Sequence, residues 1–262
     1  MAFFKVTLQT LLLVSAAMIS YGQHAEELNI RAKELLIKGD MADAIPILQE
    51  AADAGSAEAA YNLAICYQQG DGIAQNDSIA NLWMLKSAGN GWVDAQYQMS
   101  YNYAAGKGIK QDYTQAFHWT EQCALQHDPD CMFNMAICYQ RGIGTPENTD
   151  SMVSWTIRLA LLPNPVDLRL SGKITAARLN LAKMYMNGTN VPRNLERSYM
   201  WFLIYNENKR DFSLLVQQQN INLIKEEENQ LTPENKSQAI SDAEKIFGHP
   251  LTNLINLHMP DL

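Results

Sequence analysis

The sequence of 262 residues predicts an all-α protein, a solenoid of stacked helix–turn–helix repeats with capping helices at both ends. The prediction rests on three series of residues that share one period. Tryptophan, tyrosine and glycine each recur at spacings of 36, 36 and 46 residues: Trp83, Trp119, Trp155 and Trp201; Tyr67, Tyr103, Tyr139 and Tyr185; Gly70, Gly106, Gly142 and Gly188. A fixed period of this length is the sequence signature of a repeat architecture.

The first element is a predicted secretory signal peptide over residues 1–22. Lys5 supplies a positive start, residues 6–19 are mostly apolar, and Ser20-Tyr21-Gly22 places small residues where a signal peptidase reads them. The apolar run is short and interrupted, which argues against a membrane span, although an uncleaved anchor stays an open alternative. We therefore expect an exported mature chain that begins at Gln23, periplasmic or secreted, with no membrane span after cleavage.

Each repeat is expected to contain two helices joined by a glycine turn. In the first repeat, Ala59, Leu63 and Tyr67 recur at four-residue spacing, which places them on one face of a helix. A second turn glycine follows two residues after the first in three repeats (Gly72, Gly108 and Gly144), and Asn190 takes its place in the last. Asparagine tolerates the left-handed backbone that glycine provides there. One such helix pair cannot bury its apolar face alone, so the repeats must stack.

Residues 57–70 resemble the first helix of a tetratricopeptide repeat. The 36-residue period, the Gly-x-Gly-Ile turn and the later Ala-x-x-Trp are similar to its Sel-like repeat (SLR) branch. The resemblance divides the chain into SLR repeats at 57–92, 93–128, 129–174 and 175–209, with a tetratricopeptide-like cap at 23–56 and capping helices and a tail at 210–262. Tyr199-Met200-Trp201-Phe202 and Leu231-Thr232-Pro233-Glu234 resemble the ending of exported bacterial SLR proteins. The family implies a right-handed α-solenoid.

The third repeat departs from the period by an insertion of ten residues, at 163–172. Pro163 and Pro165 exclude a continuous helix through its beginning. Insertions in solenoids usually map to a loop on one face, which is often the binding face. We therefore expect a loop, and both a functional loop and simple sequence drift stay open.

Four cysteines in an exported chain permit two disulfides, but the repeat register favours one. Cys123 and Cys131 flank residues 127–130, which can turn the chain and bring the two sulfurs together. A Cys-x7-Cys at this junction also resembles the cysteine-rich SLR subgroup, in which such pairs staple the repeats. Cys66 and Cys138 lie two repeats apart, too far to bond, and are expected to be buried thiols.

No constellation of residues indicates an enzyme or a cofactor. Cys123, His127 and Cys131 have the spacing of metal ligands, but a disulfide would consume both sulfurs and no fourth ligand is evident. The sequence contains no phosphate-binding loop, no H-E-x-x-H and no G-x-S-x-G motif. It also lacks an S-x-x-K with K-T-G, which matters because some cysteine-rich SLR proteins have been discussed as β-lactam-binding or β-lactam-hydrolysing. The formal charge of −8 argues against nucleic-acid binding.

The resemblance implies a concave groove lined by the first helix of each repeat. The expected groove residues are Asn62, Gln98, Asn134 and Asn180, with Tyr101 and Lys183 one turn further on in two of the repeats. A primary amide both donates and accepts hydrogen bonds, so a row of amides suits the backbone of an extended peptide. The same amides could instead bond neighbouring backbone and serve only the fold. The residues leave both interpretations open.

Basic residues concentrate between residues 141 and 197, where eight basic side chains accompany four acidic ones. Arg141, Arg169, Lys173 and Arg178 form the expected basic patch beside the insertion. Such a patch could receive an acidic segment or a carboxylate terminus. The alternative is a solvated surface that balances neighbouring charges.

Together these observations predict an exported, non-catalytic scaffold or binding module that recognises a peptide or protein segment on its concave face. The basic patch favours an acidic partner. The alternative function is a secreted effector or small-molecule binder of the cysteine-rich SLR type, with a cell-wall fragment or a β-lactam as ligand. No cofactor, metal or nucleic acid is expected.

Overall fold

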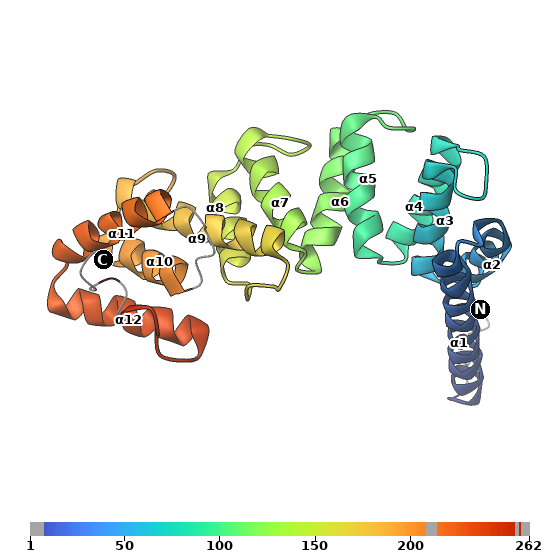
Figure 1. Ribbon diagram of the computed structural model, residues 1–262, viewed down its shortest axis with the longest axis horizontal. Helices are drawn as coiled ribbons and strands as arrows, with labels where there is room; N and C mark the ends of the chain where they lie inside the picture. The colour runs from blue at the N-terminus through green and yellow to red at the C-terminus, as the bar shows by residue number, and fades with distance from the viewer. Residues whose placement is uncertain (1–7, 208–213, 255–256, 258–262) are drawn as a thin grey trace, which may run out of the picture. The chain divides into compact units, whose positions relative to one another are not determined.

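The computed structural model describes residues 8–207, 214–254 and 257, and these residues form α-helices and no strands (Figure 1). The predicted all-α solenoid is confirmed. The chain divides into two compact units, Met1–Gln126 and His127–Leu262, called here the N-terminal and the C-terminal unit. Within the described residues, no helix has the combination of length and apolar character that crossing a bilayer requires. Residues 1–7 of the predicted signal peptide lie outside the described residues.

The N-terminal unit consists of three helical hairpins in chain order. Its helices are α1 (Leu8–Lys38), α2 (Met41–Asp53), α3 (Ala57–Gln69), α4 (Asp77–Gly89), α5 (Val93–Ala105) and α6 (Tyr113–Leu125). Small side chains at the helix contacts, among them Ala51, Ala52, Ala59 and Ala60, are fully buried and allow the backbones to approach. Larger side chains such as Leu48 and Leu63 fill the space between the hairpins. One core cluster therefore joins the first hairpin to the second, and another, which includes Met84 and Met99, joins the second to the third.

The C-terminal unit continues the same plan. Its helices are α7 (Pro129–Arg141), α8 (Thr149–Ala160), α9 (Leu168–Asn187), α10 (Leu195–Glu207), α11 (Leu214–Asn229) and α12 (Pro233–Phe247). Met135, Leu159, Leu181 and Phe202 are buried in its core. Thr232 caps α12 by accepting a hydrogen bond from the Asn235 amide, and α12 packs against α10.

The turn that ends each first helix has the backbone expected from the glycine pattern. Gly70, Gly106, Gly142 and Gly188 end α3, α5, α7 and α9 in the left-handed conformation. Asn190 has a φ of 65°, which confirms that it takes the place of the second glycine. At Gly108 a side chain would also collide with the preceding hairpin, because a Cβ atom there would lie 2.7 Å from Asn81 Nδ2. This glycine is thus required both by its backbone angle and by packing.

The insertion is not a loop throughout, which corrects the expectation from the prolines. Only residues 161–167 are non-helical, and the remainder, from Leu168, forms the beginning of α9. Asp167 caps this helix by accepting hydrogen bonds from the amides of Arg169 and Leu170. As a result α9 has 20 residues, whereas α3, α5 and α7 each have 13. Both prolines precede the N-cap residue Asp167 and therefore do not interrupt the helix.

The cysteines divide into one disulfide and two thiols. Cys123 and Cys131 are disulfide-bonded, so neither sulfur is available as a thiolate metal ligand. Cys66 and Cys138 are free and buried. Burial raises the pKa of both thiols, which keeps them in the unreactive protonated form at neutral pH.

An ion-paired glutamate anchors α1 to α3 in the N-terminal unit. Glu58, at the second position of α3, accepts hydrogen bonds from Asn29 Nδ2 and from Lys33 Nζ, each at 2.7 Å. Asn29 and Lys33 lie one turn apart on α1. Burial alone would raise the pKa of Glu58, but the hydrogen bonds from Lys33 and Asn29 and the charge of Lys33 outweigh it and lower that pKa.

This anchor predicts a pH-dependent contribution to stability. Because the pKa of Glu58 is lower in the folded chain than in the unfolded chain, its contribution is present above the unfolded pKa and is lost as the pH falls through the folded pKa. We expect Glu58→Gln to reduce the free energy of unfolding at pH 7 by up to about 1 kcal/mol. The difference from wild type should shrink towards zero in acid. Urea denaturation at several pH values measures it, and a pH-independent difference would contradict the anchor.

Candidate functional site

The C-terminal unit contains a groove of about 490 Å³ between α7, α8 and α9. It is lined by Phe133, Ala136, Ile137, Gln140, Arg141, Met152, Thr156, Leu159, Ala177, Asn180, Lys183, Met184, Asn187, Thr189 and Asn190. Its volume lies within the range of about 300–1,000 Å³ that is typical of ligand pockets in proteins. Phe133 and Ile137 are one turn apart on α7 and face the same groove as Asn180 and Lys183 of α9.

The groove combines apolar and polar side chains. Apolar surface comes from aromatic, aliphatic and thioether groups, of which Met152 and Leu159 are buried. Amides come from Gln140, Asn180, Asn187 and Asn190. Two cations, Arg141 and Lys183, also line it, and neither forms an ion pair with a carboxylate of the described residues. The groove therefore offers apolar contact, hydrogen bonding and uncompensated positive charge together.

The predicted groove residues fall into both units. Asn180 and Lys183 line the groove, whereas Asn134 is half-buried on α7 and is not among the lining residues. Asn62 lies half-buried on α3 of the N-terminal unit, and Tyr101 is 55% exposed on α5. The structure thus brings together only part of the predicted set.

Gln98 has a structural contact in the N-terminal unit. Its Nε2 donates to Asn102 Oδ1 at 2.8 Å, Asn102 Nδ2 donates to Asn81 Oδ1 at 2.7 Å, and Asn81 Nδ2 donates to the Lys107 carbonyl at 2.8 Å. Asn102 and Asn81 are buried, so this chain of amides satisfies polar groups that would otherwise be costly to bury. The Gln98 amide therefore has a partner within the fold.

The expected basic patch is corrected at Arg178, which is buried and only 3% exposed. Its guanidinium donates to the carbonyls of Ala160 and Leu162 and to Asn164 Oδ1, at 2.9, 2.7 and 2.7 Å. These acceptors lie at the end of α8 and in the connection that follows it. Burial lowers the pKa of Arg178 to about 10, so the side chain is still charged at neutral pH. Arg178 fastens the insertion and does not offer charge to a ligand.

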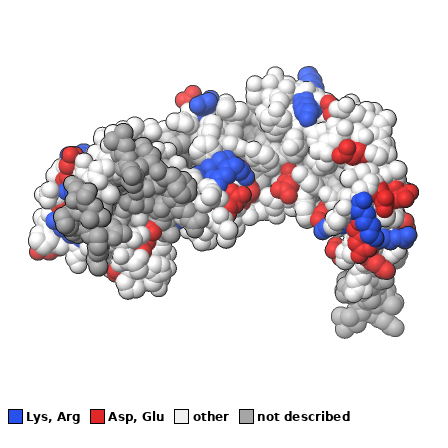
Figure 2. Space-filling model, in the orientation of Figure 1, with Lys and Arg blue, Asp and Glu red and all other residues white. Residues whose placement is uncertain are grey.

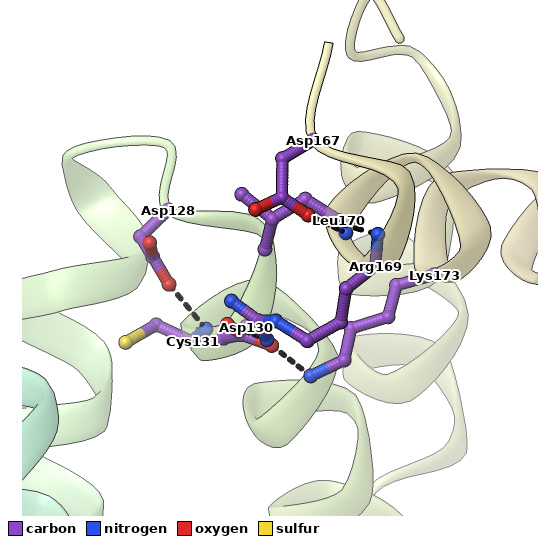
Figure 3. Close-up of polar contacts among 7 residues, drawn as sticks. All are labelled: Asp128, Asp130, Cys131, Asp167, Arg169, Leu170 and Lys173. Carbon is purple, nitrogen blue, oxygen red and sulfur yellow. Dashed lines mark hydrogen bonds and ion pairs between the residues drawn. The ribbon is translucent and has the colours of Figure 1, made fainter. Parts of the chain in front are cut away.

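Arg169 and Lys173 also have a partner within the fold, the buried carboxylate of Asp130 (Figure 3). Arg169 Nη1 lies 2.5 Å from Asp130 Oδ2, and Lys173 Nζ pairs with the other oxygen of the same carboxylate. Asp130 is not among the residues that the sequence predicts as functional. A signal was present, because Glu58, Asp94 and Asp130 occupy one repeat position at 36-residue spacing. Of the predicted patch, only Arg141 carries charge that lines the groove.

The surface that the described residues present in Figure 2 also shows no large basic patch. On the face drawn in Figure 2, uncharged side chains cover most of the surface, and basic and acidic groups lie next to one another in small clusters. No broad basic field is visible on that face among the described residues. Recognition of a ligand there would depend on local charges, which act over about 8–10 Å at physiological salt.

A second hollow of about 570 Å³ lies between α8, α9, α10 and α12. Trp201 and Tyr185 contribute aromatic surface, and the guanidinium carbon of Arg197 lies 5.6 Å from the centroid of the Tyr185 ring. Lys245 forms an ion pair with Asp242 at 2.8 Å. The cations of this hollow therefore already have partners, unlike those of the groove.

Comparison with known proteins identifies the repeats. A family model described as Sel1 repeat matches residues 57–92, 93–128, 129–151 and 175–204. A Sel1 repeat protein from Oxalobacter formigenes is 20% identical and has a TM-score of 0.54, with 83% of this chain and 82% of that chain covered. A protective antigen with an SLR fold, present in uropathogenic Escherichia coli strains, is 17% identical over 94% of this chain and 79% of that chain, with a TM-score of 0.29. A comparison with curated proteins finds no match.

The hydrogen bonds of Arg178 make a prediction about stability. Replacing Arg178 by Met keeps much of the side-chain volume but leaves buried carbonyl groups without a donor, so we expect a loss of about 3 kcal/mol in the free energy of unfolding. Arg141→Met, on the exposed side of the groove, is the matched control and should change stability by less than about 0.5 kcal/mol. Chemical denaturation followed by tryptophan fluorescence measures both. Equal effects of the two substitutions would contradict the anchoring role.

Proposed function

Because the chain belongs to the Sel1-repeat (SLR) branch of the tetratricopeptide-like superfamily, we propose that it is an exported, non-catalytic module that binds a peptide or protein segment. The proposed site is the groove between α7, α8 and α9. The observation that carries the proposal is the composition of this groove, in which apolar side chains, amides and two unpaired cations line one hollow. Protein interaction is the general role of Sel1-repeat solenoids, and the groove is the place that we propose for it.

An extended segment suits the polar lining. Gln140, Asn180 and Asn187 offer side-chain amides, and each can donate to a carbonyl and accept from an N–H of a peptide backbone. Phe133, Ile137 and Met184 would contact apolar side chains of the same segment. Methionine adapts to differently shaped partners because its side chain is unbranched and flexible. Hydrogen bonds would provide orientation and apolar contacts most of the affinity.

Arg141 and Lys183 favour an acidic segment. An acidic group entering the groove would meet positive charge that no described carboxylate neutralises. By contrast, Arg169 and Lys173 are paired with Asp130, and Arg178 is buried against carbonyl groups. The two groove cations are thus the members of the basic cluster that have charge to offer a partner.

Two features support export. The sequence begins with the elements of a signal peptide, and Cys123 and Cys131 are disulfide-bonded. Disulfides persist mainly in oxidising compartments such as the periplasm and the extracellular space.

The hollow beside α12 favours a second candidate function, binding of a small molecule. Its volume of about 570 Å³ and its aromatic lining by Trp201 and Tyr185 are typical of small-molecule sites. Such a ligand would be mainly apolar, since Arg197 and Lys245 are occupied by contacts within the fold. A mainly apolar ligand would differ from the cell-wall fragment or β-lactam that the sequence-based alternative names, because both of those are polar molecules.

A peptide library tests the principal proposal. Immobilised mature chain, Gln23–Leu262, is offered random nine-residue peptides, and the bound peptides are sequenced. We expect enrichment of peptides in which Asp or Glu adjoins apolar residues. Asn180→Trp should reduce their affinity about tenfold or more, because a large side chain would fill the groove at an exposed position.

Two further variants complete this experiment. Asn62→Trp, at the same repeat position in the N-terminal unit, is the matched control and should bind as wild type does. Arg141→Gln combined with Lys183→Gln should remove the preference for acidic residues while leaving apolar selection in place. If Asn180→Trp binds the selected peptides unchanged, the groove is not the site. If wild type selects no peptide but binds apolar small molecules, the second candidate function replaces the first.

A further inference from the structure

The insertion extends α9 by about two turns at its N-terminal end, and these turns carry a pair of cations. Arg169 and Lys173 are separated by four residues and lie on the same side of the helix. Both reach Asp130, the second residue of α7 (Figure 3). The family match in the third repeat ends at residue 151, so these turns lie outside the repeat pattern. The insertion thus adds a contact that the repeats alone do not supply.

Because Asp130 is buried, its carboxylate depends on its two cationic partners. Asp130 is 7% exposed, and a carboxylate removed from water is costly unless charged or hydrogen-bonding partners surround it. Each of its two oxygens has its own cation, and the two cations come from successive turns of α9. A single salt bridge would allow α9 to pivot about one point. Here α9 is held at two points along its axis, one turn apart, which opposes sliding of α9 along α7 and tilting of α9 about the Asp130 carboxylate.

Lys173 connects the ion pair at Asp130 to the lining of the groove. Lys173 Nζ lies 5.5 Å from the centroid of the Phe133 ring, and Phe133 lines the groove. Further along α9, Arg178 bonds the carbonyls of Ala160 and Leu162 at the end of α8. Polar contacts therefore fasten α9 to α7 and to α8, and these three helices line the groove.

The N-terminal unit contains the same arrangement, and it also provides a control. Glu58, at the equivalent position of α3, binds Asn29 and Lys33, which are likewise one turn apart on a neighbouring helix. Asp94, at this position in α5, is exposed and forms no ion pair with any described residue. The acid by itself therefore does not make the contact. A matching pair of partners one turn apart is needed, and at α9 it consists of Arg169, in the insertion, and Lys173, directly after it.

We infer that the insertion is a strut that sets the spacing between α7 and α9, with Asp130 as the positioning residue of the groove. The inference deepens the proposed function and rests on it for its effect on binding. Its structural half concerns the distance between two helices, which can be measured without any ligand. Asp130 acts through Arg169 and Lys173 and need not touch the bound segment.

A distance measurement tests the strut in the full mature chain. Cys66 and Cys138 are replaced by Ala, and spin labels are attached to cysteines introduced at Gln140 and Asn187. These positions lie at the ends of α7 and α9 away from Asp130, where a change in the angle between the helices moves the labels most. We expect Asp130→Asn to broaden the distance distribution between the labels, and Asp94→Asn to leave it unchanged.

Binding provides the second readout. Asp130→Asn should weaken binding of a library-selected acidic peptide about tenfold, in line with the coupling found for residues that act through packed helices. Asp130→Glu retains the charge on a longer arm, as Glu58 does in its own site, and should restore a narrow distribution and most of the affinity. If Asp130 only contributed to overall stability, the label distances in Asp130→Asn and Asp130→Glu would not be expected to differ. A broad distribution in the first variant and a narrow one in the second would therefore indicate positioning.

Clear outcomes would overturn the strut. An unchanged distance distribution in Asp130→Asn would do so, and so would equal broadening in Asp94→Asn. If Asp130→Asn fails to fold, Arg169→Gln removes one contact from a side chain that is 61% exposed, and the same distance decides the question. Failure of wild type to bind any peptide would reject the proposed function, whereas the label distance would still decide whether the strut exists.

Discussion

A helical hairpin of this chain cannot bury its own apolar face, so within each unit the neighbouring hairpins pack on one another to form a core. Alanines at the contacts bring helices close together, and side chains such as Leu63 and Met135 then fill the remaining volume. The left-handed turns at Gly106 and Gly142 direct the second helix of each hairpin back along the first. These constraints determine the stack but not the chemistry of its surface. The recognition that we propose would therefore depend on what the individual repeats add.

In the C-terminal unit, the insertion and the helices beside it add a set of polar contacts. These contacts determine which charged side chains are available to a ligand. A buried charge needs partners, and Asp130 and Arg178 obtain theirs from the insertion and the helices beside it. The cations used in this way are not free for a ligand. Arg141 and Lys183 are left, and they lie in a groove whose other members are apolar or neutral. The proposed preference for an acidic segment follows from this separation of structural and available charge.

The local, periodic features of the structure could be predicted from the sequence. Repeat spacing gave the hairpins and the left-handed turns, including the substitution at Asn190. The disulfide between Cys123 and Cys131 also followed, because the repeat register left these two cysteines as the plausible pair. Such features depend on residues close in sequence or on a repeated pattern.

Contacts between residues that are far apart in the sequence could not be predicted in this way. Asp130 and Arg169 are 39 residues apart, and no periodic pattern links them. From the sequence alone, Arg178 is expected to be a surface charge, although it is only 3% exposed in the structure. The prolines of the insertion suggested a loop because they forbid helix locally, but Asp167 starts a new helix directly afterwards. Whether a polar residue serves the fold or a ligand depends on partners that only the tertiary structure brings near.

The central claim is that the groove of the C-terminal unit holds an acidic peptide segment. Hydrogen–deuterium exchange of the wild-type chain, with and without a library-selected acidic peptide, tests it most directly, because a bound segment slows local opening of the helices it contacts. The account predicts slower exchange in α7 and α9 and unchanged exchange in α3 and α5. Protection confined to α3 and α5, or to α10 and α12, would contradict it.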